Sequence, residues 1–400
     1  MTVLRRLTST VAVLALAGIV AGTAVAALSR KTGDATAWAA ARQGGSADAQ
    51  AAARTVVVSL AALTAGGAVA DPSDEGFSEA GAVAAGGAVA GSSCSPGCSS
   101  YDAIVRLRDG TVRRLGTLGG FAAISTAINE RGTVVGQADT ALFEPNGLAV
   151  SLAFVADEDG MRSLGTLPGY VNSQAYGLND RGEVVGWTYN TDPVTARTVQ
   201  NFRGFVVDRA GVMHDLGTLG GATAIARDIS NSGQIVGGSR IADGRNRAFL
   251  YEHGTMTELP SLGGVSDEAT GINERGWMVG SAVYPGQPAA RRAVLWRNGG
   301  IEDLGTLGGT TARAWRINER GDVVGQARTG NGQTHAFLWR DGVMSDLGTL
   351  GGPTSVALGL NDAGIVVGFS ETGVIHPLFG PIVHAFRWED GVMEDLGPLF

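Results

Sequence analysis

The chain has 400 residues with 62 Gly, a hydrophobic share of 44%, a charged share of 17% and a formal net charge of −8. This apolar content is too high for a disordered chain, and the glycines do not recur at every third position as they do in collagen. The negative charge argues against a general nucleic-acid binder, which should be basic.

The N-terminus is typical of an export signal. Arg5 and Arg6 form a short basic region, an apolar run covers Val11–Leu28, and Ala24-Val25-Ala26 fits a small-x-small cleavage site. Residues 1–26 are therefore predicted to be a signal peptide, and the mature protein is predicted to be secreted. The alternative is an uncleaved segment that anchors the protein to the membrane, because 18 apolar residues are at the lower limit for a span.

The segment after this signal offers little side chain for a core. Residues 27–82 are dominated by Ala and Gly and are expected to form a linker. Cys94 and Cys98 follow in Cys-Ser-Pro-Gly-Cys, which in an oxidising compartment predicts a local disulfide. Free thiols are the alternative. A metal site would need two further ligands, and the chain has no other Cys.

From Tyr101 to the end the chain consists of repeats. Three signatures recur in fixed order: Leu-Gly-Thr-Leu-Gly-Gly, then Ile-Asn-x-x-Gly-x-Val-Val-Gly, then Ala-Phe-Leu-Trp-x-x-Gly-x-Met. The first signature begins at Leu115, Leu164, Leu216, Leu259, Leu304, Leu347 and Leu396, some of them variants. Such a period, between 43 and 52 residues, indicates a repeat architecture.

Each repeat is predicted to contain four short strands. In one repeat these are Ala336–Trp339, Val343–Leu347, a strand that ends at Leu360, and Ile365–Val367, with Gly-containing turns between the members of each hairpin. Four antiparallel strands per period match one blade of a β-propeller. Residues 83–400 are therefore predicted to be an all-β propeller. A solenoid, whose rungs are shorter, and a sandwich are the alternatives.

The number of blades depends on the chain ends. Seven hairpins of the Ala-Phe-Leu-Trp type follow Tyr101, but only six of the Ile-Asn type. Residues 83–92 match the second signature in a degraded form, and Gly87 precedes Gly132 by one period. Pairing of this hairpin with the C-terminal hairpin Ala385–Leu396 would close a seven-bladed ring. If the match is accidental, the ring has six blades and a spare hairpin.

The signatures carry a family resemblance. Together with His335-Ala336-Phe337 and His384-Ala385-Phe386, they resemble the HAF repeat of extracellular bacterial proteins, over residues 101–400. The resemblance implies an exported repeat protein and supplies no established activity. Other repeats depart from it, since Arg203, Arg247 and Arg292 stand where these two have His.

Sequence motifs for catalysis are missing. The chain has no Gly-x-Ser-x-Gly elbow, His-Glu-x-x-His, P-loop or dinucleotide fingerprint, so no cofactor and no metal site are predicted. His335 and His384 begin strands and are expected to form hydrogen bonds there. Trp296, Trp339 and Trp388 share one register and are expected in the core.

Three connections between predicted strands are longer than the others: Ala138–Leu152, Trp187–Arg203 and Phe369–His384. Long loops on a rigid scaffold commonly bind ligands. The candidate binding residues on them are Phe143, Trp187, Tyr189, Asn190, Asp192 and Arg197. Glu371 and His376 are weak catalytic candidates, because both are titratable and neither is repeated.

The leading hypothesis is a secreted, non-enzymatic binding or structural module. Its ligand would be an extracellular or cell-envelope protein or glycan, with no nucleic acid and no membrane contact beyond the N-terminal segment. The alternative is a propeller-type hydrolase or lyase that acts on an extracellular polymer, with Glu371 and His376 as acid and base on the long connections.

Overall fold

The computed structural model describes residues 78–94, 101–192, 201–376 and 380–397, with only the backbone for Cys94 and His376. The predicted signal peptide, Cys98 and most of the predicted linker therefore lie outside it. All regular elements in the described ranges are strands: β1 (Ser78–Val83), β2 (Val89–Cys94), β3 (Tyr101–Arg106), β4 (Val112–Gly116), β5 (Gly119–Ile128), β6 (Val134–Phe143), β7 (Ala149–Asp157), β8 (Gly160–Gly165), β9 (Asn172–Leu178), β10 (Val184–Tyr189), β11 (Arg203–Val207), β12 (Met213–Asp215), β13 (Gly220–Ile229), β14 (Ile235–Ile241), β15 (Asn246–Glu252), β16 (Thr255–Glu258), β17 (Glu268–Ile272), β18 (Met278–Val283), β19 (Arg291–Arg297), β20 (Gly300–Asp303), β21 (Gly308–Ile317), β22 (Val323–Thr329), β23 (Thr334–Arg340), β24 (Val343–Asp346), β25 (Ser355–Leu360), β26 (Val366–His376), β27 (Gly380–Glu389) and β28 (Val392–Gly397).

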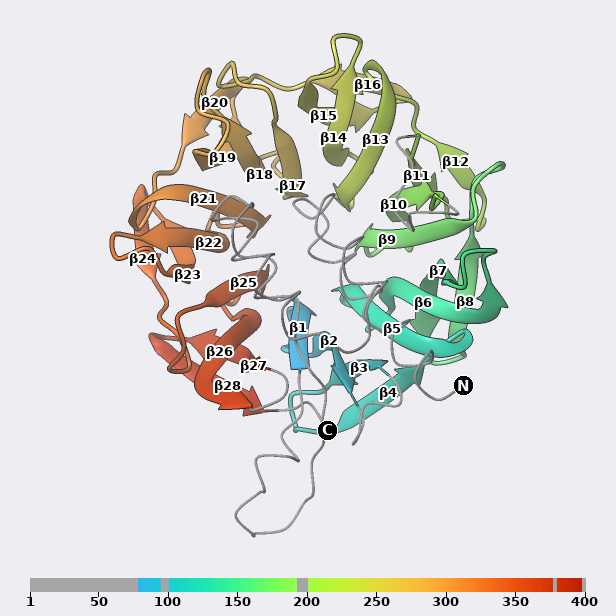
Figure 1. Ribbon diagram of the computed structural model, residues 1–400, viewed down its shortest axis with the longest axis horizontal. Coiled ribbons are helices and arrows are strands. Elements are labelled where there is room, and N and C mark those ends of the chain that lie inside the picture. The colour runs from blue at the N-terminus through green and yellow to red at the C-terminus, as the bar shows by residue number, and fades with distance from the viewer. Residues whose placement is uncertain (1–77, 95–100, 193–200, 377–379, 398–400) are drawn as a thin grey trace, which may run out of the picture.

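These strands form five four-stranded antiparallel sheets and one eight-stranded sheet. Figure 1 shows the sheets arranged around a centre, with the first strand of a set nearest the centre, as in β9, β13 and β17, and the last at the rim, as in β12, β16 and β20. Short antiparallel strands that meander from centre to rim are the blades of a propeller. The protein is thus an all-β propeller with four-stranded blades, as predicted.

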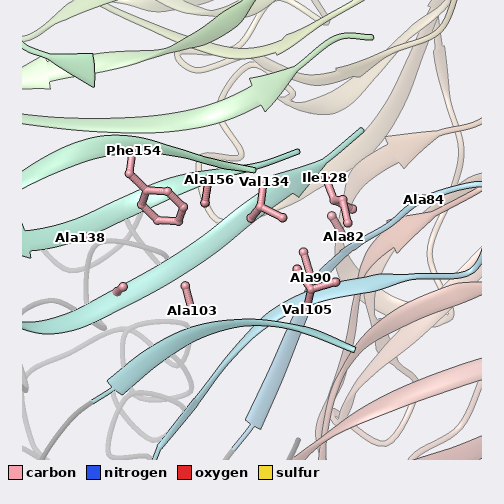
Figure 2. Close-up of a cluster of buried hydrophobic side chains, with 11 residues drawn as sticks. Ala82, Ala84, Ala90, Ala103, Val105, Ile128, Val134, Ala138, Phe154 and Ala156 are labelled. Atoms are coloured by element: carbon pink, nitrogen blue, oxygen red, sulfur yellow. The ribbon is translucent and has the colours of Figure 1, made fainter. Parts of the chain in front are cut away.

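The eight-stranded sheet consists of two sets, β1–β4 and β5–β8. Only one parallel residue pair, Tyr101 with Ala122, joins them. The sets pack face to face: Figure 2 shows Ala90 and Ala103 from the first set in one buried cluster with Val134 and Phe154 from the second. Packing of this kind resembles the contact between separate sheets more than a continuous flat sheet.

The Ala-Phe-Leu-Trp signature supplies the core between sheets. Its Phe residues on the third strands are fully buried at Phe154, Phe205, Phe249, Phe337 and Phe386. Trp296 and Trp339 are also buried, as predicted, while Trp388 is partly buried and packs against the cluster that contains Phe386. Because the strands contact neighbours on both faces, their apolar residues do not alternate strictly with polar ones.

The predicted grouping of strands into blades was shifted by one hairpin, that is by two strands, from the observed grouping. Sets such as β21–β24, from Gly308 to Asp346, begin after Leu-Gly-Thr-Leu-Gly-Gly, so this signature connects one set to the next. In the predicted strand list it fell between the second and third strands of a repeat. Both kinds of hairpin have tight turns of similar composition, and the turns alone do not indicate which two hairpins share hydrogen bonds.

The N-terminal hairpin forms, but with a different partner from the one predicted. β1 and β2 pair around a turn at Gly87, and β2 pairs with β3. β1 starts at Ser78, inside the expected linker. The described strands do not include the predicted pairing with the C-terminal hairpin, because β1–β4 and β25–β28 are each complete sets. β1 instead packs against β25, β26 and β27.

Side chains join the first and last sets of strands that the structure describes. Ser78 Oγ donates to Gly397 O at 2.5 Å and accepts from Ala385 N at 3.1 Å. Arg106 Nη1 donates to Leu396 O at 3.2 Å. The first and last sets are therefore joined by side-chain hydrogen bonds and packing.

Asn residues of the second signature connect neighbouring turns. Asn273 Nδ2 donates to Asn318 O at 3.0 Å, Asn318 Nδ2 to Asn361 O at 3.2 Å, and Asn361 Nδ2 to Ala84 O at 3.0 Å. The Oδ1 atom of each Asn also accepts backbone N–H groups of its own turn, as Asn273 does from Arg275 and Trp277. The Asn thus shapes one turn and attaches it to the next sheet.

The residue after each turn Asn, or after Ala84 and Ser230 at the same position, forms a second row of hydrogen bonds. Its backbone N–H donates to a side chain of the next turn in the pairs Ala85–Glu130, Glu130–Asp180, Asp180–Asn231, Asn231–Glu274, Glu274–Glu319 and Glu319–Asp362. The row stops after Asp362, because the following turn has Ala85, whose side chain has no acceptor.

Asn273→Ala should lower the free energy of unfolding by about 2–3 kcal/mol, because it removes a buried group with three hydrogen bonds. Glu274→Ala is the control, since it removes the acceptor of the single bond from Asn231 N and should cost at most about 1 kcal/mol. Urea unfolding measures both. Equal losses in the two variants would refute the role given to the Asn.

Candidate functional site

The middle of the ring holds a cavity of about 140 Å³ lined by first strands of six sets. The position two residues before each turn Asn is small in most sets, as at Ala82, Ala127 and Gly359. Asp228 on β13 and Arg316 on β21 break this pattern and also line the cavity. The only large and charged residues at this position therefore come from two sets separated by β17–β20.

Asp228 and Arg316 both reach β17. Asp228 Oδ2 accepts from Ile272 N at 3.2 Å, and Arg316 Nη1 donates to Thr270 O at 2.9 Å. Gly271 lies between these two residues, where a Cβ would approach Trp315 O to 3.0 Å. Burial raises the pKa of Asp228, and the positive charge of Arg316 partly opposes this rise.

A second charged group lies on β9, β13 and β17. Arg227 Nε binds Glu268 Oε1 at 2.6 Å, and both side chains are 9% exposed. The guanidinium carbon lies 4.3 Å from the centre of the Tyr176 ring. Burial alone would lower the pKa of Arg227, but the adjacent Glu268 carboxylate raises it above its ordinary value. The pair is therefore charged, buried and held in one geometry.

Next to these groups, β21 carries Arg313, Trp315 and Arg316 within four residues. Trp315 Nε1 is buried and has no hydrogen-bond partner in the described part of the chain. We call Tyr176, Arg227, Asp228, Glu268, Arg313, Trp315 and Arg316 the inner-strand cluster. Its four strands, β9, β13, β17 and β21, belong to consecutive sheets (Figure 1).

Sequence reasoning missed this cluster. The usable signal was variation just before the Ile-Asn signature, where other repeats have Ala-Ile-Asn, Gly-Leu-Asn or Gly-Ile-Asn. Asp228 and Arg316 are the charged exceptions. The lengths of connections and the motifs for catalysis, on which the predicted site residues rest, carry no information about this position.

The predicted binding residues Trp187 and Tyr189 are buried on β10. Their rings stack at 4.5 Å between centroids, and Phe202 meets Trp187 edge-on. Trp187 Nε1 donates to Gln174 Oε1 at 3.2 Å, and Tyr189 Oη accepts from Gln137 Nε2 at 2.8 Å. The two aromatic rings are thus part of the contact between sheets and present little surface to a ligand.

The other predicted loop residues come from loops that meet, since Thr191, between Asn190 and Asp192, forms hydrogen bonds with Glu144 and Asn146 of the β6–β7 loop. Phe143 is 54% exposed at the end of β6. Asn190 fixes a connection by donating to Gly169 O and accepting from Val171 N. Asp192 is partly buried, and Arg197 lies outside the described residues. Two of the predicted long loops are largely hairpin, since β6–β7 and β26–β27 extend into them.

Glu371 and His376 both lie on β26. Glu371 is buried, and the side chain of His376 is outside the description. Their cross-strand partners are Val383 and Gly380, which are three residues apart. At roughly 3.3 Å per residue this places the two Cα atoms roughly 10 Å apart. The hypothesis of an acid–base pair remains a prediction.

The strand-initial histidines form hydrogen bonds as predicted. His335 Nδ1 lies 2.7 Å from Asp346 Oδ2, and His384 Nδ1 lies 2.9 Å from Asp395 Oδ2. Over the described ranges, no group of three or more His, Cys, Asp or Glu side chains is arranged to hold a metal ion. No helix in the same ranges is long and apolar enough to cross a membrane.

Glu79 on β1 allows a test by pH. Burial raises the pKa of its carboxyl from 4.5 to about 7. The folded state therefore prefers protonated Glu79, and this stabilisation is complete below about pH 4.5 and is lost as the pH rises through 7. We expect Glu79→Gln to be more stable than the wild type by about 3 kcal/mol at pH 8, with a smaller difference at pH 5. Thermal unfolding across this range measures it. A difference that does not change with pH would contradict the assignment.

Comparisons with known proteins agree with the fold. No protein-family model matches the chain, and no curated protein does. The β-propeller domain of the Trilobed protease from Pyrococcus furiosus, described as having an open velcro topology, is 13% identical with a TM-score of 0.52, over 80% of this chain and 98% of that one. A puromycin hydrolase mutant in complex with PGG is 14% identical with a TM-score of 0.52, over 85% of this chain. The match spans 57% of the hydrolase chain. At this identity the likeness shows the fold alone.

Proposed function

We propose that the protein is an exported, non-enzymatic β-propeller that binds a ligand at the inner-strand cluster. The supporting observation is that charged residues replace small ones around the central cavity in only some repeats. Scaffold residues recur because every blade needs them. A buried ion pair adds little net stability compared with small or apolar residues, so stability alone does not account for Arg227, Asp228, Glu268 and Arg316 in these sets.

We also propose that the ring has seven blades, with the eight-stranded sheet counted as two. The hydrogen-bond row that starts at Ala85 and reaches Asp362 connects seven turns, one for each four-strand set. Packing of β1 on β25–β27 would close the ring. Export is supported by the signal-like residues 1–26, and a disulfide between Cys94 and Cys98 would fit that compartment.

A hydrolase or lyase that acts on an extracellular polymer is the second candidate. The similar structures include the propeller domain of a protease and a puromycin hydrolase. In this chain, Glu371 and His376 are the residues to test as acid and base. Release of reducing ends or unsaturated products from a polymer by the wild type, and its loss in Glu371→Gln, would favour this candidate.

A thermal-shift screen of the mature chain tests the binding proposal. The panel contains neutral and acidic cell-wall oligosaccharides, calcium, zinc and a chelator, and each hit is repeated with Trp315→Phe, which removes the buried indole N–H together with part of the ring. Trp277→Phe is the matched control, because Trp277 lies in the turn after β17 and contacts Arg275 and Arg297.

A ligand at a hundred times its dissociation constant stabilises the folded state by about 2.7 kcal/mol. We expect a hit to shift the wild type and Trp277→Phe equally and Trp315→Phe less. Equal shifts in all three proteins would place the ligand elsewhere. A panel without any hit would count against a glycan or metal ligand.

A further inference from the structure

The inner strands of the ring are divided by charge. The first two strands of the three consecutive sets β13–β24 carry five Arg and two acids: Arg227, Arg240, Arg313, Arg316 and Arg328 against Asp228 and Glu268. The first two strands of the other four sets carry no Arg or Lys and three acids: Glu79, Asp139 and Glu371. In a protein of net charge −8, one side of the centre is therefore basic.

The basic side continues from β14 to β19. Arg240 pairs across the strands with Asn246, and Asn246 forms an isolated bridge with Ser266. Arg291 Nη2 donates to Ser266 Oγ at 3.3 Å, and Arg291 Nη1 donates to Ser281 Oγ at 3.1 Å. Arg240 and Arg291 are thus separated by two hydrogen-bonding residues, and both are partly exposed.

The acids near this path are occupied by buried cations. Glu268 binds Arg227 at 2.6 Å, and Asp267 binds Arg247 at 3.3 Å. The side chains of all four residues are at most 9% exposed. Two further carboxylates near this path, Asp243 and Glu258, are exposed, but each already has a cationic partner, Arg245 at 2.6 Å and Arg247 at 3.1 Å.

On the basis of the proposed function, we infer that this basic side binds the carboxylate or phosphate groups of an extracellular polyanion. A guanidinium donates two parallel hydrogen bonds to either group. The buried Trp315 N–H, between Arg313 and Arg316 in sequence, is a further donor that needs an acceptor. The acidic remainder of the surface repels polyanions, so the basic side also directs their approach.

Titration calorimetry of the mature full chain tests this inference. The probes are a polygalacturonate oligomer for carboxylate, a short polyphosphate for phosphate, and neutral dextran. We expect binding to one or both anions, weaker binding at 200 mM than at 50 mM salt because charges are screened, and none to dextran. The probe that binds shows whether the site recognises carboxylate or phosphate groups.

The variants are Arg240→Ala and Arg313→Ala, with thermal unfolding as the check that each is folded. Each should weaken anion binding about tenfold, since a charge-assisted hydrogen bond contributes that much or more, and Arg240→Lys should recover part of the loss. The control Arg162→Ala on β8, whose side chain is 65% exposed and far out on its sheet, should bind as the wild type does.

Equal affinity of wild type, Arg240→Ala and Arg313→Ala would overturn the inference, as would the failure of both anions to bind. If a neutral ligand from the screen binds with dependence on Trp315 while the anions do not, the inference fails and the proposed function stands. If neither the screen nor the anions give binding, both fail.

Discussion

Gly325→Ala is expected to lower the free energy of unfolding by at least about 3 kcal/mol, through steric overlap between β21 and β22. A Cβ at Gly325 would lie 1.9 Å from Arg313 O and 2.9 Å from Ala314 Cα, both backbone atoms of the neighbouring strand. Relief requires the two strands to separate. The loss should be accompanied by weaker ligand binding, because Arg313 is on the displaced strand.

Gly330→Ala is the matched control in the same set. Its nearest neighbour would be Gly308 O at 3.9 Å, and its φ is not in the left-handed region. We expect a change within about 0.5 kcal/mol. Urea unfolding measures the stability of both variants. Similar stabilities would show that close contact between the strands does not require Gly at the end of Val-Val-Gly.

Arg227→Met is expected to cost about 3–5 kcal/mol, because it leaves Glu268 buried without its cation. The double variant Arg227→Met with Glu268→Gln should recover much of this loss, since neither side chain is then charged. Asp243→Asn is the control: its pair with Arg245 is 47% and 45% exposed, and surface pairs contribute about 0–1 kcal/mol.

Denaturant unfolding of the single and double variants forms a double-mutant cycle, which gives the coupling between Arg227 and Glu268. A loss in Arg227→Met no larger than in Asp243→Asn would show that water reaches the pair. The ligand assay adds a second readout, because the pair is part of the inner-strand cluster. Restored stability without restored binding in the double variant would separate folding from function.

Strands and tight turns could be predicted because each repeat carries the residues that specify them locally. Turn glycines and the Asn of each Ile-Asn signature indicated hairpins, and even the degraded match at Gly87 predicted a real one. The partner of each hairpin could not be predicted in this way. Which two hairpins on either side of Leu347–Gly352 share a sheet depends on hydrogen bonds with distant strands, and the predicted strand list grouped the wrong hairpins.

The site was less predictable than the fold. Trp187 and Tyr189 looked like loop residues able to stack on a ligand, but they are on β10 and bury their rings between sheets. Asp228 and Arg316 are charged at a position that holds a small residue in the other repeats. Aligning the repeats in the sequence is enough to find this difference. Their approach to the same stretch of β17 needed the structure.

The crystal structure of the mature protein with the tightest ligand from the screen is the most direct test of the account. We predict that the ligand lies at the inner-strand cluster, against β13, β17 and β21, and within hydrogen-bond distance of Arg313 or Trp315 Nε1. A ligand found only on the β6–β7 or β26–β27 hairpins, with the inner-strand cluster unchanged, would contradict the central claim.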